Sequence, residues 1–235
     1  MNVSVVLASF NGEKYIQEQL NSILQELHFD DEFIITDDGS TDGTVAMIDK
    51  FRNVDSRIVL LQGPGKGFVK NFEFGVKQVT KEIIILADQD DIWLPGRRDE
   101  VVKEFAKNHA DLVLVSGKLV DENLNPIEDG NDRFEFKSGF WQNFWKNRFT
   151  GNFMAFKSDF RSEFLPFPRK LDYHDSWIGL MACLEKKKII YIDKKFILFR
   201  RHDKVQSGKR RNIFKIMWSR IVLLSNLMLR KVKFM

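Results

Sequence analysis

The sequence predicts an α/β protein with a mostly parallel sheet flanked by helices. Short apolar, β-branched runs alternate with segments whose apolar residues recur at helical spacing. Polar clusters follow the ends of these runs. Strands joined through helices form right-handed crossovers and a parallel sheet covered on both faces. At 235 residues the chain suits one such domain or two small ones.

The first hundred residues contain four strand and helix repeats. The expected strands are residues 3–10, 31–36, 57–63 and 82–87. The expected helices are residues 11–27, a helix through Val45, Ile48 and Phe51, residues 68–79, and a helix that begins near Pro95. Further along, residues 150–156 place a Gly-Asn pair before a strand-like run, and a helix is expected just after Asp175.

Composition limits the class of protein. The single cysteine, Cys183, excludes an internal disulfide and a multi-cysteine zinc site. No basic and apolar leader opens the sequence, so a cytosolic location is expected. The net charge is only +4, and the basic excess is concentrated late in the chain. This asymmetry favours an anionic surface near the C-terminus as a partner, and no nucleic acid is expected.

Polar clusters follow all four strands. They read ASFNG, DDGSTD, GPGKG and DQDD in chain order, so they fall on the carboxyl edge of the sheet, where ligands bind. Asp37 and Asp38 can accept hydrogen bonds from a base or ribose, with Gly39 allowing close approach, or they can cap the next helix. The GPGKG glycines resemble a phosphate loop but lack the Walker Lys-Ser/Thr pair.

The run IIILADQDDIW places three aspartates where a buried strand meets solvent. Their mutual repulsion favours a bound cation, although a solvated turn with a helix-capping Asp is the alternative. A divalent ion bridging phosphate oxygens, Mg²⁺ or Mn²⁺, suits these ligands. Alternation along an extended chain predicts that Asp88 and Asp90 face one way and Gln89 the other. Asp91 then faces the substrate or caps the helix near Pro95.

Three segments, VSVVLASFNGEKYIQEQLNSIL, DDGSTDGT and ADQDDIWLPGR, together resemble family 2 glycosyltransferases with the GT-A fold. The resemblance is to the bacterial polysaccharide branch that includes rhamnosyltransferases. It extends more loosely to TGNFMAF, YHDSW and RRHDKVQSG. It implies a nucleotide-sugar-binding half at 1–117, an acceptor-binding and catalytic half of the same domain at 118–208, and a basic amphipathic helix at 209–235.

The resemblance also implies the donor site. The residues expected to bind the nucleotide sugar are Ala8, Ser9, Phe10, Asn11, Asp38, Gly39, Asn71, Asp88 and Gln89. Asp38 would accept a hydrogen bond from a pyrimidine ring. The usual Ala-Arg before Asn71 is Val69-Lys70 here, and lysine lacks the bidentate geometry of arginine for a phosphate.

The same resemblance assigns the remaining chemistry. The expected acceptor-binding residues are Asp91, Trp93, Gly151, Asn152 and His174, and the expected Mn²⁺ or Mg²⁺ ligands are Asp90 and His202. Asp175 matches the catalytic carboxylate, with a helix N-cap as its alternative role. In an inverting transfer, this base takes the acceptor proton while the metal stabilises the departing diphosphate.

The expected activity moves a sugar from a UDP- or dTDP-sugar to a glycan or lipid-linked acceptor. A nucleotidyltransferase and a non-catalytic nucleotide-binding module are the alternatives. Nucleotidyltransferases usually carry a Gly-rich basic loop after the first strand, whereas ASFNGEKY has one glycine and no arginine.

Residues 209–235 combine apolar residues near helical spacing with flanking Arg and Lys. The segment has no run of eighteen apolar residues that would span a bilayer. It is expected to lie on an anionic leaflet, at the inner face of the plasma membrane. The alternative is a helix packed on its own domain or on a partner subunit.

Overall fold

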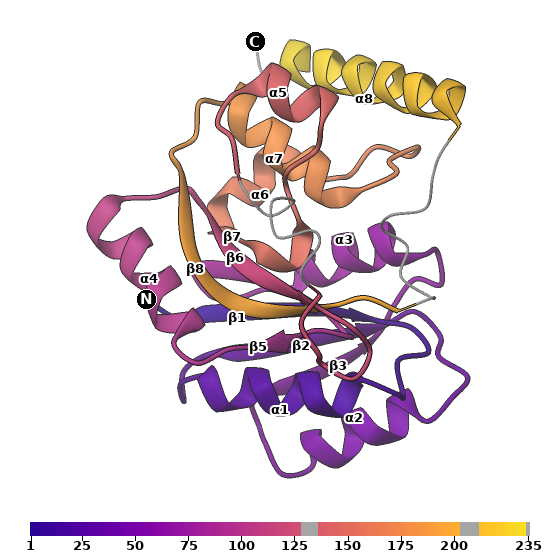
Figure 1. Ribbon diagram of the computed structural model, residues 1–235, viewed down its shortest axis with the longest axis vertical. Helices are drawn as coiled ribbons and strands as arrows, with labels where there is room; N and C mark the ends of the chain where they lie inside the picture. Colours follow the sequence, from indigo (N-terminus) through magenta and orange to yellow (C-terminus); the bar gives the residue numbers. More distant parts are fainter. Residues whose placement is uncertain (128–135, 203–211, 234–235) are drawn as a thin grey trace.

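The computed structural model describes residues 1–127, 136–202 and 212–233. They form an α/β structure around one curled, eight-stranded sheet with the strand order β3-β2-β1-β4-β7-β6-β8-β5 (Figure 1). Helices cover both faces of the sheet. The predicted fold class is confirmed.

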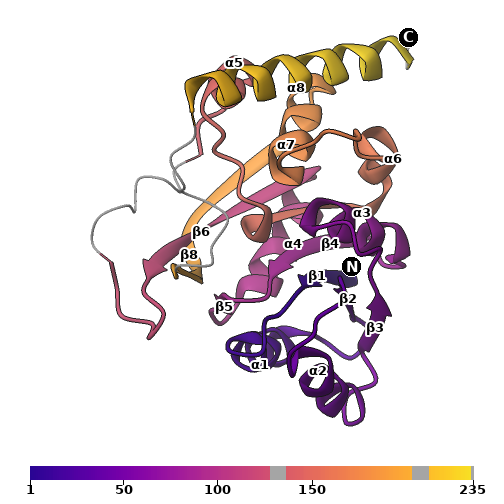
Figure 2. The ribbon, with the colours of Figure 1, turned by 90° about the vertical axis from the view of Figure 1, so that its right-hand side faces the viewer.

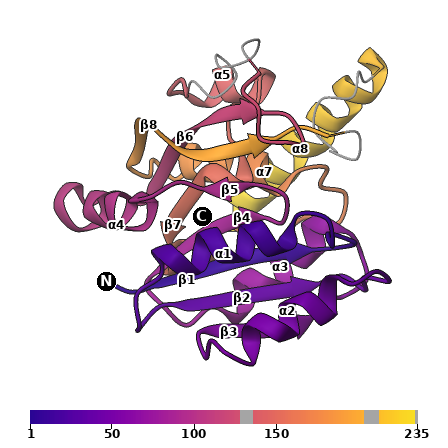
Figure 3. The same ribbon diagram turned by 60° about the horizontal axis from the view of Figure 1, so that its bottom comes forward.

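The first half of the sheet is parallel, as predicted. Its strands are β1 (Val3–Ser9), β2 (Glu32–Asp37), β3 (Ile58–Gln62) and β4 (Ile83–Asp88). The helices between them are α1 (Ile16–Glu26), α2 (Thr44–Arg52) and α3 (Phe68–Gln78). Figures 2 and 3 show α1 and α2 on one face, and Figure 2 shows α3 on the other.

Side chains of β1 alternate between two apolar cores. Val5 and Leu7 pack with α1, while Val6 packs with α3 on the opposite face. All three are fully buried, and each such burial contributes about 1.5–3 kcal/mol relative to exposure. The strand is therefore apolar on both faces, as a central parallel strand should be.

The start of α1 corrects one prediction. Residues 11–15 do not belong to the helix, because the Gly12 carbonyl accepts the N–H groups of both Tyr15 and Ile16 in a tight turn. The helix thus begins at Ile16. The freed segment becomes a loop above the carboxyl end of the sheet.

The second half of the sheet contains antiparallel pairs that periodicity alone did not indicate. β7 runs antiparallel to both β4 and β6, β8 is parallel to β6, and β5 is antiparallel to β8. These strands are β5 (Ile92–Trp93), β6 (Leu112–Val120), β7 (Met154–Lys157) and β8 (Ile189–Arg200). The helices are α4 (Arg97–Asn108), α5 (Phe140–Trp145), α6 (Arg161–Phe164) and α7 (His174–Leu184), with 3-10 turns η2 (Gly151–Phe153) and η3 (Ser158–Phe160).

The last helix, α8 (Ile213–Lys233), packs on its own chain. Leu223 and Leu227 are buried in the core that α7 also lines. Arg230 donates hydrogen bonds to the carbonyls of Phe164 and Leu165 at the end of α6. Among the described helices, none is both long and apolar enough to cross a membrane.

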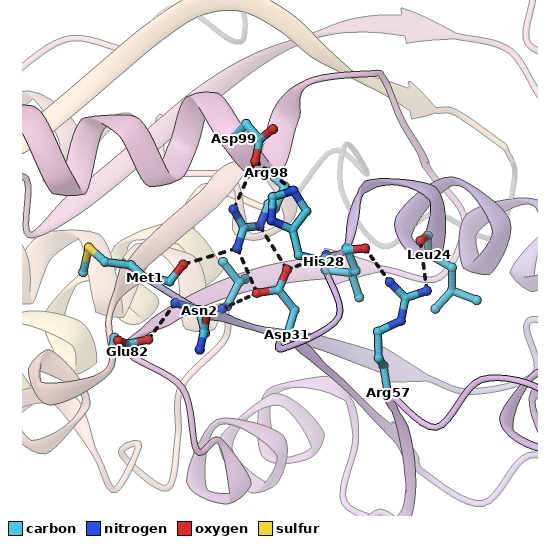
Figure 4. A network of polar contacts seen from close by, with 11 residues as sticks. Met1, Asn2, Leu24, His28, Asp31, Arg57, Glu82, Arg98 and Asp99 are labelled. Carbon is cyan, nitrogen blue, oxygen red and sulfur yellow. Dashed lines mark hydrogen bonds and ion pairs between the residues drawn. The ribbon is translucent and has the colours of Figure 1, made fainter.

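A buried ion pair fixes the amino edge of the sheet, away from the polar clusters. Asp31 accepts hydrogen bonds from Arg98 at 2.9 and 3.0 Å and from the backbone N–H groups of Val3 and His28 (Figure 4). Burial opposes ionisation of Asp31, but these hydrogen bonds outweigh it and lower its pKa. One carboxylate therefore joins β1, β2 and α4.

Candidate active site

The carboxyl ends of the parallel strands meet at one edge, as the sequence predicts. The sheet register pairs Ser9 of β1 with Asp37 of β2, and Ala8 with Asp88 of β4. Asp37 in turn pairs with Gln62 at the end of β3. The four polar clusters therefore share a rim.

The acidic cluster does not continue as an extended strand. β4 ends at Asp88, and the following residues turn, so the predicted alternation does not apply to Gln89 and Asp90. Gln89 instead pairs with the backbone of Phe10, at 2.9 and 3.1 Å. A Cβ at Gly12 would lie 2.4 Å from the Gln89 Oε1 atom, so a larger residue there would displace the Gln89 amide from this position.

Asp90 and His202, the two predicted metal ligands, lie together. The His202 Nε2 atom is 2.9 Å from Asp90 Oδ2, although 112 residues separate them in the chain. The His202 ring packs against Tyr15, with centroids 4.8 Å apart, and the Arg200 guanidinium lies 4.6 Å from the same Tyr15 ring. This stack holds the imidazole at the acidic loop.

The donor set can be compared with what a divalent ion needs. Within the described ranges, no group of three or more His, Cys, Asp or Glu side chains gathers as a metal site. A carboxylate and an imidazole do converge, and Mg²⁺ or Mn²⁺ commonly binds through one or two protein groups plus substrate phosphates and water. The Asp90 and His202 pair fits an ion that arrives with a diphosphate.

Buried charge surrounds this pair. Burial, together with the charges of Asp90 and Asp175, raises the pKa of Asp88 to about 8. Burial and the charges of Asp90 and Asp88 also raise the pKa of Asp91 well above its usual range. Arg97 opposes the shift of Asp88. At neutral pH Asp88 therefore holds a proton, and a bound cation would favour its ionised form instead.

Arg97 is a further residue of the candidate site, and it was not among the residues predicted from the sequence. It is 1% exposed, its guanidinium lies 3.9 Å from the Trp93 ring, and it donates to the Asn152 carbonyl. Burial lowers its pKa to about 9, against the opposing charges of Asp91, Glu26 and Asp88. The motif ADQDDIWLPGR contains this arginine, but nothing in the pattern indicates that it turns inward.

All five predicted acceptor-binding residues are buried, and three of them lie around the acidic loop. Asp91 accepts hydrogen bonds from the Arg200 backbone N–H, at 2.8 Å, and from the Asn152 side chain. Trp93 and Asn152 are 3% and 1% exposed. Asp91 does not cap α4, whose N-cap is Gly96. These side chains join the acidic loop to the β7 wall, and their contact with an acceptor stays a prediction.

The predicted nucleotide side is preorganised by loop contacts. Phe10 is 55% exposed at the rim, while Asn11 accepts the Thr41 N–H and joins the first loop to the second. Ala8 is partly buried below them. Ser9 donates to Asp37, which also accepts the Gly39 and Ser40 N–H groups.

Asp38 holds the glycine loop that follows β3. Its carboxylate accepts the N–H groups of Gly65 at 2.7 Å and Gly67 at 2.6 Å. Neither Asp37 nor Asp38 caps α2, whose N-cap is Gly43 without a side-chain bond, so the capping alternative is wrong. Pyrimidine binding by Asp38 stays a prediction.

Asn71 lies below the rim rather than on it. It is 1% exposed, and its Nδ2 donates to the carbonyls of Thr36, at 2.7 Å, and Ser9. This joins the ends of β1 and β2. Lys70 points to Glu73 and the Phe167 carbonyl, and so takes part in a local ion pair.

Asp175 lies in the first turn of α7, which begins earlier than predicted. The N-cap is Tyr173, so Asp175 is not the capping residue. Its carboxylate accepts the Ser176 N–H and, at 3.3 Å, the Asn147 side chain. Burial raises its pKa to about 6, against these hydrogen bonds and the Arg220 charge. Since Asp175 also raises the pKa of Asp88, the two carboxylates interact across the site.

His174 precedes this carboxylate and is 5% exposed. Its ring stacks on Phe72, with centroids 4.2 Å apart, and within the described part of the chain neither ring nitrogen has a hydrogen-bond partner. Burial lowers its pKa to about 3, so the imidazole is neutral at physiological pH. A Cβ at Gly151 would lie 2.6 Å from His174 Nε2, which shows how closely these two predicted acceptor residues approach.

Comparison with known proteins identifies the class. The family model described as Glycosyl transferase family 2 matches residues 4–165, more than half of the chain. The protein therefore belongs to glycosyl transferase family 2. This assignment confirms the family predicted from the sequence and decides against a nucleotidyltransferase.

Two curated relatives align over most of the chain. The dTDP-rhamnosyl transferase RfbG of Shigella flexneri is 28% identical over 241 residues, covering 96% of this chain and 81% of its own length. The GalNAc(5)-diNAcBac-PP-undecaprenol beta-1,3-glucosyltransferase of Campylobacter jejuni is 26% identical over 224 residues, covering 91% and 70%. Against two other curated relatives the chain spans less than half of the relative's length, 40% and 43%.

Solved structures share the fold. Staphylococcus aureus TarS 1-349 in complex with UDP-GlcNAc superposes with a TM-score of 0.73 at 20% identity, covering 96% of this chain and 67% of that one. The mannosyltransferase PcManGT of Pyrobaculum calidifontis, in complex with GDP-Man and Mn²⁺, superposes with a TM-score of 0.65 at 18% identity, covering 86% and 57%. Together with the family match, they establish the GT-A fold of this glycosyltransferase.

Proposed function

We propose that this protein is an inverting, metal-dependent glycosyltransferase that uses a UDP- or dTDP-sugar in the synthesis of bacterial cell-surface polysaccharide. One observation carries the proposal. Asp90 and His202 approach to 2.9 Å, and the side chain of Asn152 donates to Asp91, next to Asp90. Asp175 accepts the backbone N–H of Gly151, the neighbour of Asn152, so the proposed base lies close to the acidic loop. A leaving-group site and a base on one rim are what sugar transfer requires.

The donor is assigned to the first 117 residues. Phe10 offers an exposed ring against which a base can stack, and the Asp38 and Gly39 turn borders the same side. The names of the relatives support a nucleoside-diphosphate sugar, since RfbG is a dTDP-rhamnosyl transferase and TarS was solved with UDP-GlcNAc. The proposed transferred group is a hexosyl or rhamnosyl group.

Asp175 is the proposed base. With a pKa of about 6 it is ionised at neutral pH yet basic enough to take the proton of an acceptor hydroxyl. Direct attack of that hydroxyl on the anomeric carbon inverts its configuration. His174 and Gly151 lie beside Asp175, so an acceptor sugar is proposed to enter there.

Asp90 and His202 are the proposed metal ligands, and PcManGT gives a precedent for Mn²⁺ in this fold. When bound, Mn²⁺ or Mg²⁺ offsets the negative charge that develops on the diphosphate. The side chain of Asp90 lies at the rim, and the Tyr15 ring packs against His202 and positions it beside Asp90.

A panel of UDP-, dTDP- and GDP-sugars, tested by thermal shift with and without Mn²⁺, examines the proposal. A Mn²⁺-dependent rise in melting temperature with one pyrimidine nucleotide sugar is expected. The proposal fails if none of these donors stabilises the protein, or if stabilisation is the same without metal and in EDTA.

The acceptor is proposed to be a glycan or a lipid-linked sugar, used at the cytoplasmic face of the plasma membrane. The undecaprenol-linked acceptor in the name of the Campylobacter relative supports this, as does the basic segment 209–235. Removing residues from Asn212 onward should release the protein from anionic vesicles, but it also removes Leu223 and Leu227 from the core and should therefore lower the melting temperature. Vesicle binding that persists in folded, truncated protein would contradict this role of the segment.

A further inference from the structure

α8 has two apolar faces, and only one is covered by its own domain. Leu223 and Leu227 lie in the core. The outward face carries large apolar side chains at helical spacing, each between 47% and 80% exposed: Phe214, Met217, Trp218, Ile221, Met228 and Leu229. A helix with so wide an apolar surface is normally covered all round.

The short helix α5 adds a second exposed aromatic group. Trp141 and Trp145 are 62% and 60% exposed, close to the 63% of Trp218. α5 lies at the same end of the molecule as α8 (Figures 1 and 2). Arg220 of α8 connects the two helices, since it donates to the Trp145 carbonyl at 3.4 Å and lies 5.8 Å from the Phe144 ring.

The charge of these segments indicates what covers them. Residues 136–149 and 212–233 contain no Asp or Glu, and Lys137 and Lys146 are exposed beside the α5 tryptophans. Tryptophan is favoured at the boundary between lipid headgroups and acyl chains, and basic residues are attracted to anionic headgroups. A second copy seated on the same surface would bring two basic faces together, which is unfavourable.

We infer that α5 and the outward face of α8 form one docking surface for an anionic bilayer, with Trp141, Trp145 and Trp218 seated at the headgroup level. The inference deepens the proposed membrane association and rests on it. It adds α5, a segment remote in sequence from the C-terminal helix, and it fixes which face of α8 meets lipid.

This surface adjoins the proposed catalytic carboxylate. Arg220 also acts on Asp175, whose pKa its charge lowers, and Ser219 donates to Asp172 at 2.7 Å in the loop before α7. A bilayer held by α5 and α8 therefore lies next to the acceptor side of the rim. A sugar carried on a membrane lipid would reach Asp175 without leaving the surface.

The test is cosedimentation of the full chain with vesicles of phosphatidylglycerol and phosphatidylcholine. The wild type should bind these vesicles, and bind phosphatidylcholine alone less. The double variants Trp141→Ser/Trp145→Ser and Phe214→Ser/Trp218→Ser should each weaken partitioning about tenfold or more, the factor expected when buried aromatic area is lost. Phe29→Ser is the matched control, because Phe29 is 91% exposed but lies between α1 and β2, and it should bind like the wild type.

A second measurement needs no variant. Brominated phosphatidylglycerol vesicles should quench part of the wild-type tryptophan emission, since three exposed tryptophans would enter the interface. Absence of quenching would overturn the inference.

The outcomes separate the two proposals. If only the α8 variant loses vesicle binding, the α5 part of the inference is wrong while membrane association stands. The inference fails if the wild type does not bind vesicles and light scattering instead shows a dimer that the variant Trp141→Ser/Trp145→Ser dissociates. The surface would then be a protein interface. Mn²⁺-dependent donor stabilisation, measured on the same samples, reports on glycosyltransferase function independently.

Discussion

Replacing Asp175 by Asn should raise the free energy of unfolding, because burial disfavours the charged Asp175 carboxylate. The same replacement should abolish most of the sugar transfer, because this carboxylate is the proposed base. The pKa of a free Asp side chain is 3.8, and burial in the folded protein raises the pKa of Asp175 to about 6. Two pKa units correspond to about 3 kcal/mol, and partial solvent exposure reduces the expected gain to about 1–2 kcal/mol.

The sign depends on pH. A raised pKa means that the folded state holds its proton more tightly than the unfolded chain, so the free energy of unfolding falls as pH rises from about 4 to 6. Asn cannot ionise and does not lose this stability. Asp175→Asn should therefore exceed the wild type in stability at pH 8 and match it near pH 4.

The rate should respond in the opposite direction. Asn cannot accept the acceptor proton, so single-turnover sugar transfer should fall by roughly 10²–10⁴ fold while donor affinity stays. The assay is single-turnover transfer, with donor titration and urea unfolding at pH 4 and pH 8. Transfer within a few fold of the wild type would refute the role of Asp175 as base, and lower stability at pH 8 would refute the reasoning from burial.

Three further substitutions test other parts of the structure. Asp90→Asn should weaken Mn²⁺-dependent donor binding without lowering the melting temperature of the free protein, as titration calorimetry can measure; unchanged metal dependence would remove Asp90 from the ligand set. Asp31→Asn removes the buried charge that Arg98 pairs with and leaves it only the exposed Asp99 carboxylate, so the substitution should cost about 3–5 kcal/mol in urea unfolding. A loss below about 1 kcal/mol would contradict the assigned role of the buried pair. Arg220→Gln should move the acidic limb of the pH–rate profile to higher pH, because the Arg220 charge lowers the pKa of Asp175. A limb at the wild-type pH would count against this interaction.

Periodicity predicted what depends on local pattern. The parallel strands β1 to β4 and the helices between them follow from alternating apolar runs, and the shared rim follows from their direction. The antiparallel strand β7 between β4 and β6 could not be predicted this way, because strand order is set by packing of distant segments.

The sequence did not predict which residues of the candidate site are buried. Arg97 reads as an ordinary charged residue beside a turn, and Asp91 reads as a residue that faces the substrate or caps a helix. Both lie inside instead, where the charge of Asp91 opposes the lowering of the Arg97 pKa. His174 likewise reads as a loop residue before a helix but stacks on Phe72 within it. In each case the chain neighbours are uninformative, because the contacts that decide burial come from segments far away in the sequence.

Proton NMR of donor turnover tests directly whether the protein is an inverting, metal-dependent glycosyltransferase. The protein is incubated with Mn²⁺, an acceptor and the donor that stabilises it, and the anomeric signals of donor and product are followed. Loss of the donor signal, release of UDP or dTDP and a product of inverted anomeric configuration are expected, and EDTA should suppress all three. A product that retains the donor configuration, or turnover unaffected by EDTA, would contradict the proposed function.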